Sequence, residues 1–149
     1  MISEWDKEDD RQFKALTGLT YHAFCTLLPF FAQSYAQTVW ANYERQKEQR
    51  QRKPGAGQKG RLDTPFKKLY FILYYLKVYP TFDVMGDHFQ MDRSKACTNV
   101  HKLLPILITA LDKAGVLPKR QFTTAEELQV AWADIEDLLV DATERPHHR

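Results

Sequence analysis

The stretch from Thr81 to Leu104 reads TFDVMGDHFQMDRSKACTNVHKLL and contains two short helical patterns with a tight break between them. Thr81 is a residue type that caps helix starts, so the first pattern begins there. Residues 90–92 form the break, and Asp92 or Ser94 can cap the second pattern, which continues to the end of the stretch. Two helices joined by so short a turn predict a helix-turn-helix.

Small and apolar side chains in this stretch fit the inner side of such a motif. Gly86 lies where the two helices must approach closely, and Met91 is placed to plug the turn. Ala96 and Val100 stand one helical turn apart and are expected to face inward together.

Two positions depart from the usual motif. The turn has Gln90 where glycine is usual, and Asn99 occupies a position that is often apolar. The stretch by itself therefore leaves two interpretations open: a helix that reads DNA, or two helices packed into an ordinary helical bundle.

The second helix is expected to carry a polar outward face. Its N-terminal residues would lie nearest the base edges of bound DNA. Arginine can contact guanine through two hydrogen bonds, and serine or threonine can contact phosphates or bases. The residues predicted to project outward are Arg93, Ser94, Lys95, Cys97, Thr98 and His101, and all but Cys97 are candidate DNA contacts.

Positive charge is concentrated in the middle of the 149-residue chain. Residues 45–102 contain thirteen basic and five acidic side chains, a net charge of +8. The flanks 1–44 and 103–149 each have a net charge of −3, from three basic and six acidic and from five basic and eight acidic side chains. A focused positive field favours polyanions, nucleic acid first among them, although a solvated charged surface would have the same composition.

Residues 50–61, RQRKPGAGQKGR, are predicted to form a linker arm, because three glycines, a proline and five basic residues cannot bury a core. A basic glycine-rich arm beside a folded module often follows a phosphate backbone or enters a minor groove. The alternative is a flexible, solvated linker. The phosphate contacts predicted in the arm and in the helix after it are Lys53, Lys59, Arg61, Lys67 and Lys68.

Helical spacing dominates the rest of the chain and predicts a mainly α fold. A short amphipathic segment, 10–16, ends at Gly18, and Thr20 caps a second helix in which Pro29 should cause a kink or a split. The helix over 66–79 is apolar nearly all round, so it belongs at the centre of the core.

The C-terminal part is predicted to add a connector helix and a strand. The helix that contains Pro105 stops at Gly115, Thr124 opens a new helix with a capping box, and Ile135–Asp141 has the pattern of a strand. We therefore expect a helical bundle containing a helix-turn-helix, with a short C-terminal strand. The expected segments are N-terminal helices 1–49, the basic arm 50–65, the helix-turn-helix domain 66–116, and the connector helix with the first strand 117–149.

Composition favours a cytoplasmic protein with no membrane partner. No apolar stretch reaches the roughly 18–20 residues that span a membrane, the longest candidate being 69–76. The acidic N-terminus has no basic region followed by an apolar core, so no secretion signal is predicted. Cys25 and Cys97 lie far apart without a motif, which fits a reducing compartment.

The stretch from Arg50 to Arg149 resembles the N-terminal part of bacterial insertion-sequence transposases that have a DDE catalytic domain. The resemblance rests first on the basic arm that leads into FKKLYFILYYLK at 66–77. It rests further on YPT at 79–81 followed by the helix-turn-helix, and on VDATERP at 140–146.

The resemblance implies a function for both ends of this stretch. The helix-turn-helix would recognise the terminal inverted repeats of the element in double-stranded DNA. Asp141 would be the first aspartate of the DDE triad, which ends the first strand of an RNase H-like fold and helps to hold Mg²⁺. Ala142 departs from the glycine that is usual in the family, and the second aspartate and the glutamate of the triad are missing.

We therefore expect a chain that by itself is not an enzyme and holds no metal or cofactor. Asp141 would be catalytic only if a downstream catalytic half completed the site, so the chain would be a first reading frame or a truncated copy. His88, Cys97 and His101 lack a fourth ligand and the paired-cysteine spacing of a zinc site. Two other functions stay open: a helical interaction module that dimerises or recruits a separately encoded catalytic half, and a small DNA-binding repressor of the element.

Overall fold

The computed structural model describes residues 10–48, 53–55, 60–117, 124–131 and 133 of the chain. These residues form six helices and no strand, which confirms the prediction of a mainly helical fold. The strand predicted for Ile135–Asp141 lies outside the described residues. The helices are α1 (Asp10–Thr17), α2 (Tyr21–Arg45), α3 (Pro65–Val78), α4 (Phe82–His88), α5 (Arg93–Lys113) and α6 (Ala125–Ala131).

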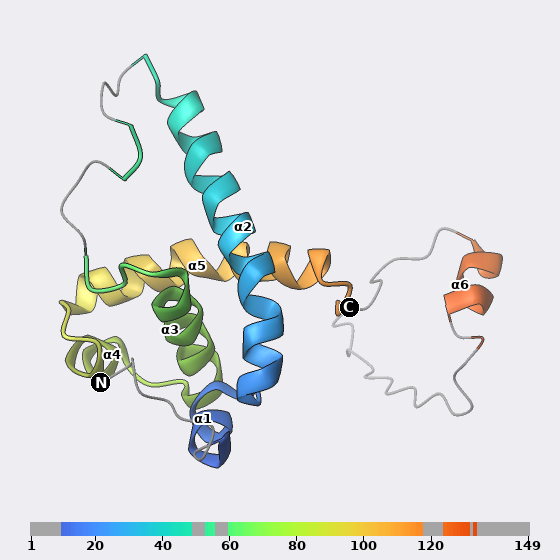
Figure 1. Ribbon diagram of the computed structural model, residues 1–149, viewed down its shortest axis with the longest axis horizontal. Coiled ribbons are helices and arrows are strands. Elements are labelled where there is room, and N and C mark those ends of the chain that lie inside the picture. Colours follow the sequence, from blue (N-terminus) through green and yellow to red (C-terminus); the bar gives the residue numbers. More distant parts are fainter. Residues whose placement is uncertain (1–9, 49–52, 56–59, 118–123, 132, 134–149) are drawn as a thin grey trace, which may run out of the picture. The chain divides into compact units, whose positions relative to one another are not determined.

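The chain divides into two units, one comprising residues 1–117 and the other residues 118–149. The first unit contains α1 to α5 and the second contains α6 (Figure 1). Although α1 and α2 were predicted as a separate segment, they share one hydrophobic core with α3, α4 and α5. The basic arm therefore connects two parts of a single core.

Threonine side chains cap helices at the positions predicted from the sequence. The hydroxyls of Thr20, Thr81 and Thr124 each accept a hydrogen bond from the N–H three residues further along, at 3.2, 3.4 and 3.2 Å. Thr64 caps α3 in the same way at 3.2 Å, a cap that was not predicted. Each bond satisfies an N–H that the first helical turn leaves without an internal partner.

Glycines end two helices as predicted, whereas a proline fails to break a third. Gly18 after α1 and Gly115 after α5 have φ of 80° and 68°, left-handed conformations that glycine adopts at low cost. Pro29 lies inside α2, which continues without a break, so the predicted alternative of a split helix is wrong. A proline in a helix interior costs about 3 kcal/mol, and burial of Phe24 and Phe31 on either side of it offsets that cost.

The central position predicted for α3 is confirmed. It packs against α1, α2 and α5 (Figure 1), and six consecutive residues, Leu69–Tyr74, are buried. The ring of Phe71 packs edge-on against Phe89, the residue that follows α4, with the ring centroids 4.8 Å apart. Burying one such side chain contributes about 1.5–3 kcal/mol, so α3 anchors the helices of the turn to the rest of the core.

No single helix in the described part of the chain is long and apolar enough to cross a membrane. The bent pair of α1 and α2 has the length and composition to do so. Three of its apolar side chains, Phe13, Phe24 and Phe31, are fully buried in the core of the first unit.

Candidate nucleic-acid interface

Gly86 of α4 lies in close contact with the turn that leads into α5. A Cβ atom at this position would lie 2.6 Å from the carbonyl oxygen of Met91 and 3.4 Å from the amide nitrogen of Arg93. Both are backbone atoms, so no rotation of a side chain could relieve the contact. The N–H of Met91 also donates to the carbonyl of Gly86 at 2.8 Å. The close approach predicted at Gly86 is therefore confirmed, and it holds α4 against the start of α5.

The two departures from the usual motif both have local explanations. Gln90 has a φ of 52°, the left-handed conformation that favours glycine, so the turn keeps a glycine-like backbone with an unusual residue. The side chain of Gln90 is exposed, so its polar amide is not buried. The side-chain amide of Asn99 donates to Sδ of Met91 at 3.6 Å, a weak polar contact to the residue that plugs the turn.

The inner and outer faces of α5 divide as the helical period predicts. Ala96 and Val100 are buried, with 0% and 3% of their surface exposed. Cys97 is half-buried, so the prediction that it projects outward holds only in part. The five candidate DNA contacts on α5 are all exposed and lie in its N-terminal half: Arg93, Ser94, Lys95, Thr98 and His101.

Two of these five residues, Arg93 and Lys95, are cations paired with carboxylates of the same motif. Nε of Arg93 lies 3.9 Å from Oδ2 of Asp83 on α4. Nζ of Lys95 lies 3.1 Å from Oδ2 of Asp92, the residue before α5. All four side chains are at least 70% exposed, and such pairs contribute about 0–1 kcal/mol. Phosphates or base edges can therefore displace the carboxylates at little cost.

The hydroxyl of Thr98 donates a hydrogen bond within α5, to the carbonyl of Ser94 at 2.8 Å. The oxygen can still accept a hydrogen bond, and the side chain also has a methyl group. In the major groove a methyl group fits the methyl of thymine, and an acceptor fits the amino group of adenine or cytosine. The internal hydrogen bond therefore limits the contacts that Thr98 can offer to a ligand.

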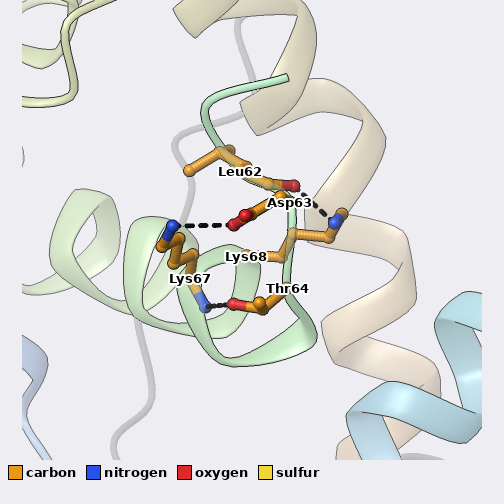
Figure 2. A network of polar contacts seen from close by, with 5 residues as sticks. All are labelled: Leu62, Asp63, Thr64, Lys67 and Lys68. Carbon is orange, nitrogen blue, oxygen red and sulfur yellow. Dashed lines mark hydrogen bonds and ion pairs between the residues drawn. The ribbon is translucent and has the colours of Figure 1, made fainter. Parts of the chain in front are cut away.

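The basic arm joins α3 through a short segment held by polar contacts (Figure 2). Oδ1 of Asp63 pairs with Nζ of Lys67 at 2.7 Å, and Nζ of Lys68 donates to the carbonyl of Leu62. The hydroxyl of Thr64 accepts from the N–H of Lys67 at 3.2 Å. The hydrogen bond from Lys67 lowers the pKa of the Asp63 carboxyl below its ordinary value. These contacts fasten the end of the arm to the first turn of α3.

The segment that contains α3, α4 and α5 matches a known protein family. Residues 60–113 match the family model described as "Helix-turn-helix of DDE superfamily endonuclease". This segment is a helix-turn-helix of the DDE superfamily. The family predicted from the sequence is thereby confirmed for these residues. No curated protein and no solved structure matches the chain.

The phosphate contacts predicted in and before the DDE-type helix-turn-helix fall into three groups. Lys53 and Arg61 are exposed. Lys67 and Lys68 are half-buried and take part in the contacts at the start of α3. Lys59 lies outside the described residues. The structure thus brings two of the five together with the helix-turn-helix and leaves two others free to reach a ligand.

Metal-ligating residues are not gathered in the described part of the chain. Within it, no group of three or more His, Cys, Asp or Glu side chains could hold a metal ion. Asp141, predicted to be catalytic once a site is completed, lies outside the described residues.

Lys102 of α5 and Tyr35 of α2 were not predicted to be functional. Lys102 lies over the ring of Tyr35, with Nζ 5.4 Å from the ring centroid. Lys68 lies over the same ring at 4.8 Å. Helical spacing was the available signal, because Lys102 stands two helical turns after Lys95 and therefore on the same side of α5. The tyrosine between the two lysines has no local signal, since it belongs to another helix.

Proposed function

We propose that the helix-turn-helix unit binds duplex DNA with the N-terminal half of α5 in the major groove and recognises the terminal inverted repeats of a transposable element. The observation that carries the proposal is the backbone contact at Gly86, which holds the start of α5 with its polar face exposed. The match to helix-turn-helices of the DDE superfamily supports it independently. Such a function favours the bacterial cytoplasm as the compartment.

The exposed face of α5 would supply the base contacts. Arg93 can donate two hydrogen bonds to guanine once its exposed ion pair opens. Thr98 offers a methyl group and an acceptor to a neighbouring base. The residues around them can bind phosphates or base edges, namely Ser94, Lys95 and His101.

The arm and the start of α3 would supply phosphate contacts. These contacts position the protein on the duplex and set its salt dependence, but they do not read sequence. Lys53 and Arg61 are exposed and need no rearrangement to reach a phosphate. Lys67 would have to break its ion pair with Asp63 before it could bind a phosphate. The residues proposed for this role are Lys53, Lys59, Arg61, Lys67 and Lys68.

The test is a titration of the full chain with a duplex carrying the element end and with a scrambled duplex, each at several salt concentrations. We expect log K to fall steeply with log salt and the element-end duplex to be preferred. Arg93→Ala combined with Lys95→Ala should weaken binding and reduce the preference, by about 1–3 kcal/mol for a lost bidentate contact. Arg11→Ala with Lys14→Ala removes the same charges from the exposed surface of α1 and is the control.

Two outcomes would contradict the proposal. An unchanged preference in the Arg93 and Lys95 double variant would remove α5 from DNA recognition. A chain that binds no duplex at moderate salt, but forms a stable dimer, would instead support the interaction module. A repressor would bind the same duplex through the same face, so these titrations would give the same result for a repressor as for the proposed function.

We further propose that this chain binds DNA without a cofactor and does not cleave it by itself. Hydrogen bonds and ion pairs to phosphates and bases require no metal. Cleavage by a DDE site would need two divalent metals held by carboxylates gathered around Asp141. A strand-nicking assay with Mg²⁺ should therefore show no cleavage. Nicking that disappears in Asp141→Ala would show that the chain is an enzyme.

A further inference from the structure

Three helices bring two ammonium groups to one tyrosine ring. Nζ of Lys68 on α3 and Nζ of Lys102 on α5 lie 4.8 and 5.4 Å from the centroid of the Tyr35 ring on α2. The ring is partly buried and packs against the hydrophobic core, which holds it in place. The face of a tyrosine attracts a cation by about 0.5–2 kcal/mol, so the ring supports both lysines.

Within the described residues these two ammonium groups have no carboxylate partner. Four ion pairs occur there, and neither Lys68 nor Lys102 takes part in any of them. Burial lowers the pKa of Lys68 below its ordinary value, and the positive charge of Lys102 lowers it further, whereas the Asp63 carboxylate acts in the opposite direction. Two like charges held on one ring repel each other, and an anion that binds to both relieves this repulsion.

The lysine pair borders the exposed face of α5. Lys95 and Lys102 are seven residues apart, so they lie on one side of the helix and about 10 Å apart along its axis. Thr98 and His101 lie between these positions in the sequence and are exposed. A DNA strand that borders the groove read by α5 would therefore pass from Lys95 toward Lys102.

We propose that Lys68 and Lys102, supported by Tyr35, clamp a backbone phosphate of duplex DNA beside the groove that α5 reads. This inference rests on the proposed DNA-binding function and adds to it a contact shared by α3 and α5. Ammonium groups bind phosphate as point charges, so the clamp adds affinity without reading sequence. The phosphate also relieves the repulsion between the two lysines.

The experiment removes each charge and compares it with a control on the same helix. Lys68→Gln is paired with Lys77→Gln in the last turn of α3, and Lys102→Gln with Lys113→Gln at the end of α5. The full chain is titrated with element-end and scrambled duplexes at several salt concentrations. Each clamp variant should reduce the magnitude of the slope of log K against log salt by about 0.9. It should also reduce the affinity roughly eightfold at about 0.1 M salt, equally for both duplexes. The control variants should keep the slope.

Further variants separate charge from folding. Lys102→Arg keeps the positive charge and should keep the slope. Thermal melting shows which variants fold, and Lys102→Gln decides the test if Lys68→Gln does not fold, because Lys102 is exposed. The clamp would be overturned if the unchanged chain shows steep salt dependence and Lys102→Gln reduces the magnitude of the slope no more than Lys113→Gln does. The proposed DNA binding would then still stand. If the unchanged chain binds no duplex, the clamp and the proposed function are both wrong.

Discussion

α3 is buried nearly all round, whereas α5, which packs against it, is buried along one side only. Tyr70 of α3 illustrates the first case, because the residue is 2% exposed and burial raises the pKa of its hydroxyl to about 12. On α5, Val100 is buried while Thr98 and His101 are exposed. One helix has all of its central side chains in the core, and the other divides them between the core and solvent.

The difference shows which residues packing accounts for. Packing explains the apolar side chains of α3 and the buried side of α5. It does not explain why one stretch of α5 exposes cations, hydroxyls and an imidazole together, so those groups are available for binding. Variants of α3 should therefore change folding, and variants on the outward side of α5 should change binding.

The largest effect is expected on stability, from the centre of α3. Phe71→Ala removes a fully buried ring that packs against Phe89 and should lower the free energy of unfolding by about 3–5 kcal/mol. Thr98→Ala on the exposed side of α5 is the comparison and should change it by less than about 0.5 kcal/mol. Urea denaturation followed by circular dichroism measures both. Equal losses would show that the outward side of α5 is as structural as α3.

A smaller effect is expected at the contact between the two helices of the motif. In Gly86→Ala the new Cβ would lie 2.6 Å from the carbonyl oxygen of Met91, so the backbone must shift, at a cost of about 1–3 kcal/mol. The start of α5 would move with it, so DNA affinity should fall as well. Gly60→Ala is the stability control, because nothing lies within 4 Å of a Cβ built there. A stable Gly86→Ala chain with full affinity would show that α5 does not depend on this contact.

The features that could be predicted from the sequence depend on near neighbours in the chain. The caps at Thr20 and Thr81 and the helix stop at Gly18 each involve residues within about one helical turn. The division between buried Val100 and exposed Thr98 requires only the helical period. These local rules were sufficient to place the motif and the outward face of α5.

The features that could not be predicted depend on contacts between distant residues. α2 continues through Pro29 because packing on both sides of the proline outweighs the lost backbone hydrogen bond, and a local rule cannot weigh tertiary burial. Tyr35, Lys68 and Lys102 are more than thirty positions apart from one another in the sequence. Only the packing of three helices brings them together, so no spacing within one helix indicates the cluster.

The smallest effect is expected from the carboxylates that pair with the cations of α5. Asp83→Asn removes the partner of Arg93, and Asp92→Asn removes that of Lys95. The free energy of unfolding should change by no more than about 1 kcal/mol, because both pairs are exposed. DNA affinity should rise for two reasons. The cation no longer has to break an ion pair before it contacts DNA, and a negative charge that repels the phosphates is removed. The same titrations measure the gain, which should shrink as salt is added.

Asp112→Asn provides the matched control for these two variants. Asp112 is exposed near the C-terminal end of α5 and takes part in none of the four ion pairs of the described residues. A larger gain in affinity for Asp83→Asn than for Asp112→Asn would place the effect in the pair with Arg93. Equal gains would mean that only the net charge of the chain matters, and the ion pairs beside α5 would then have no separate influence on binding.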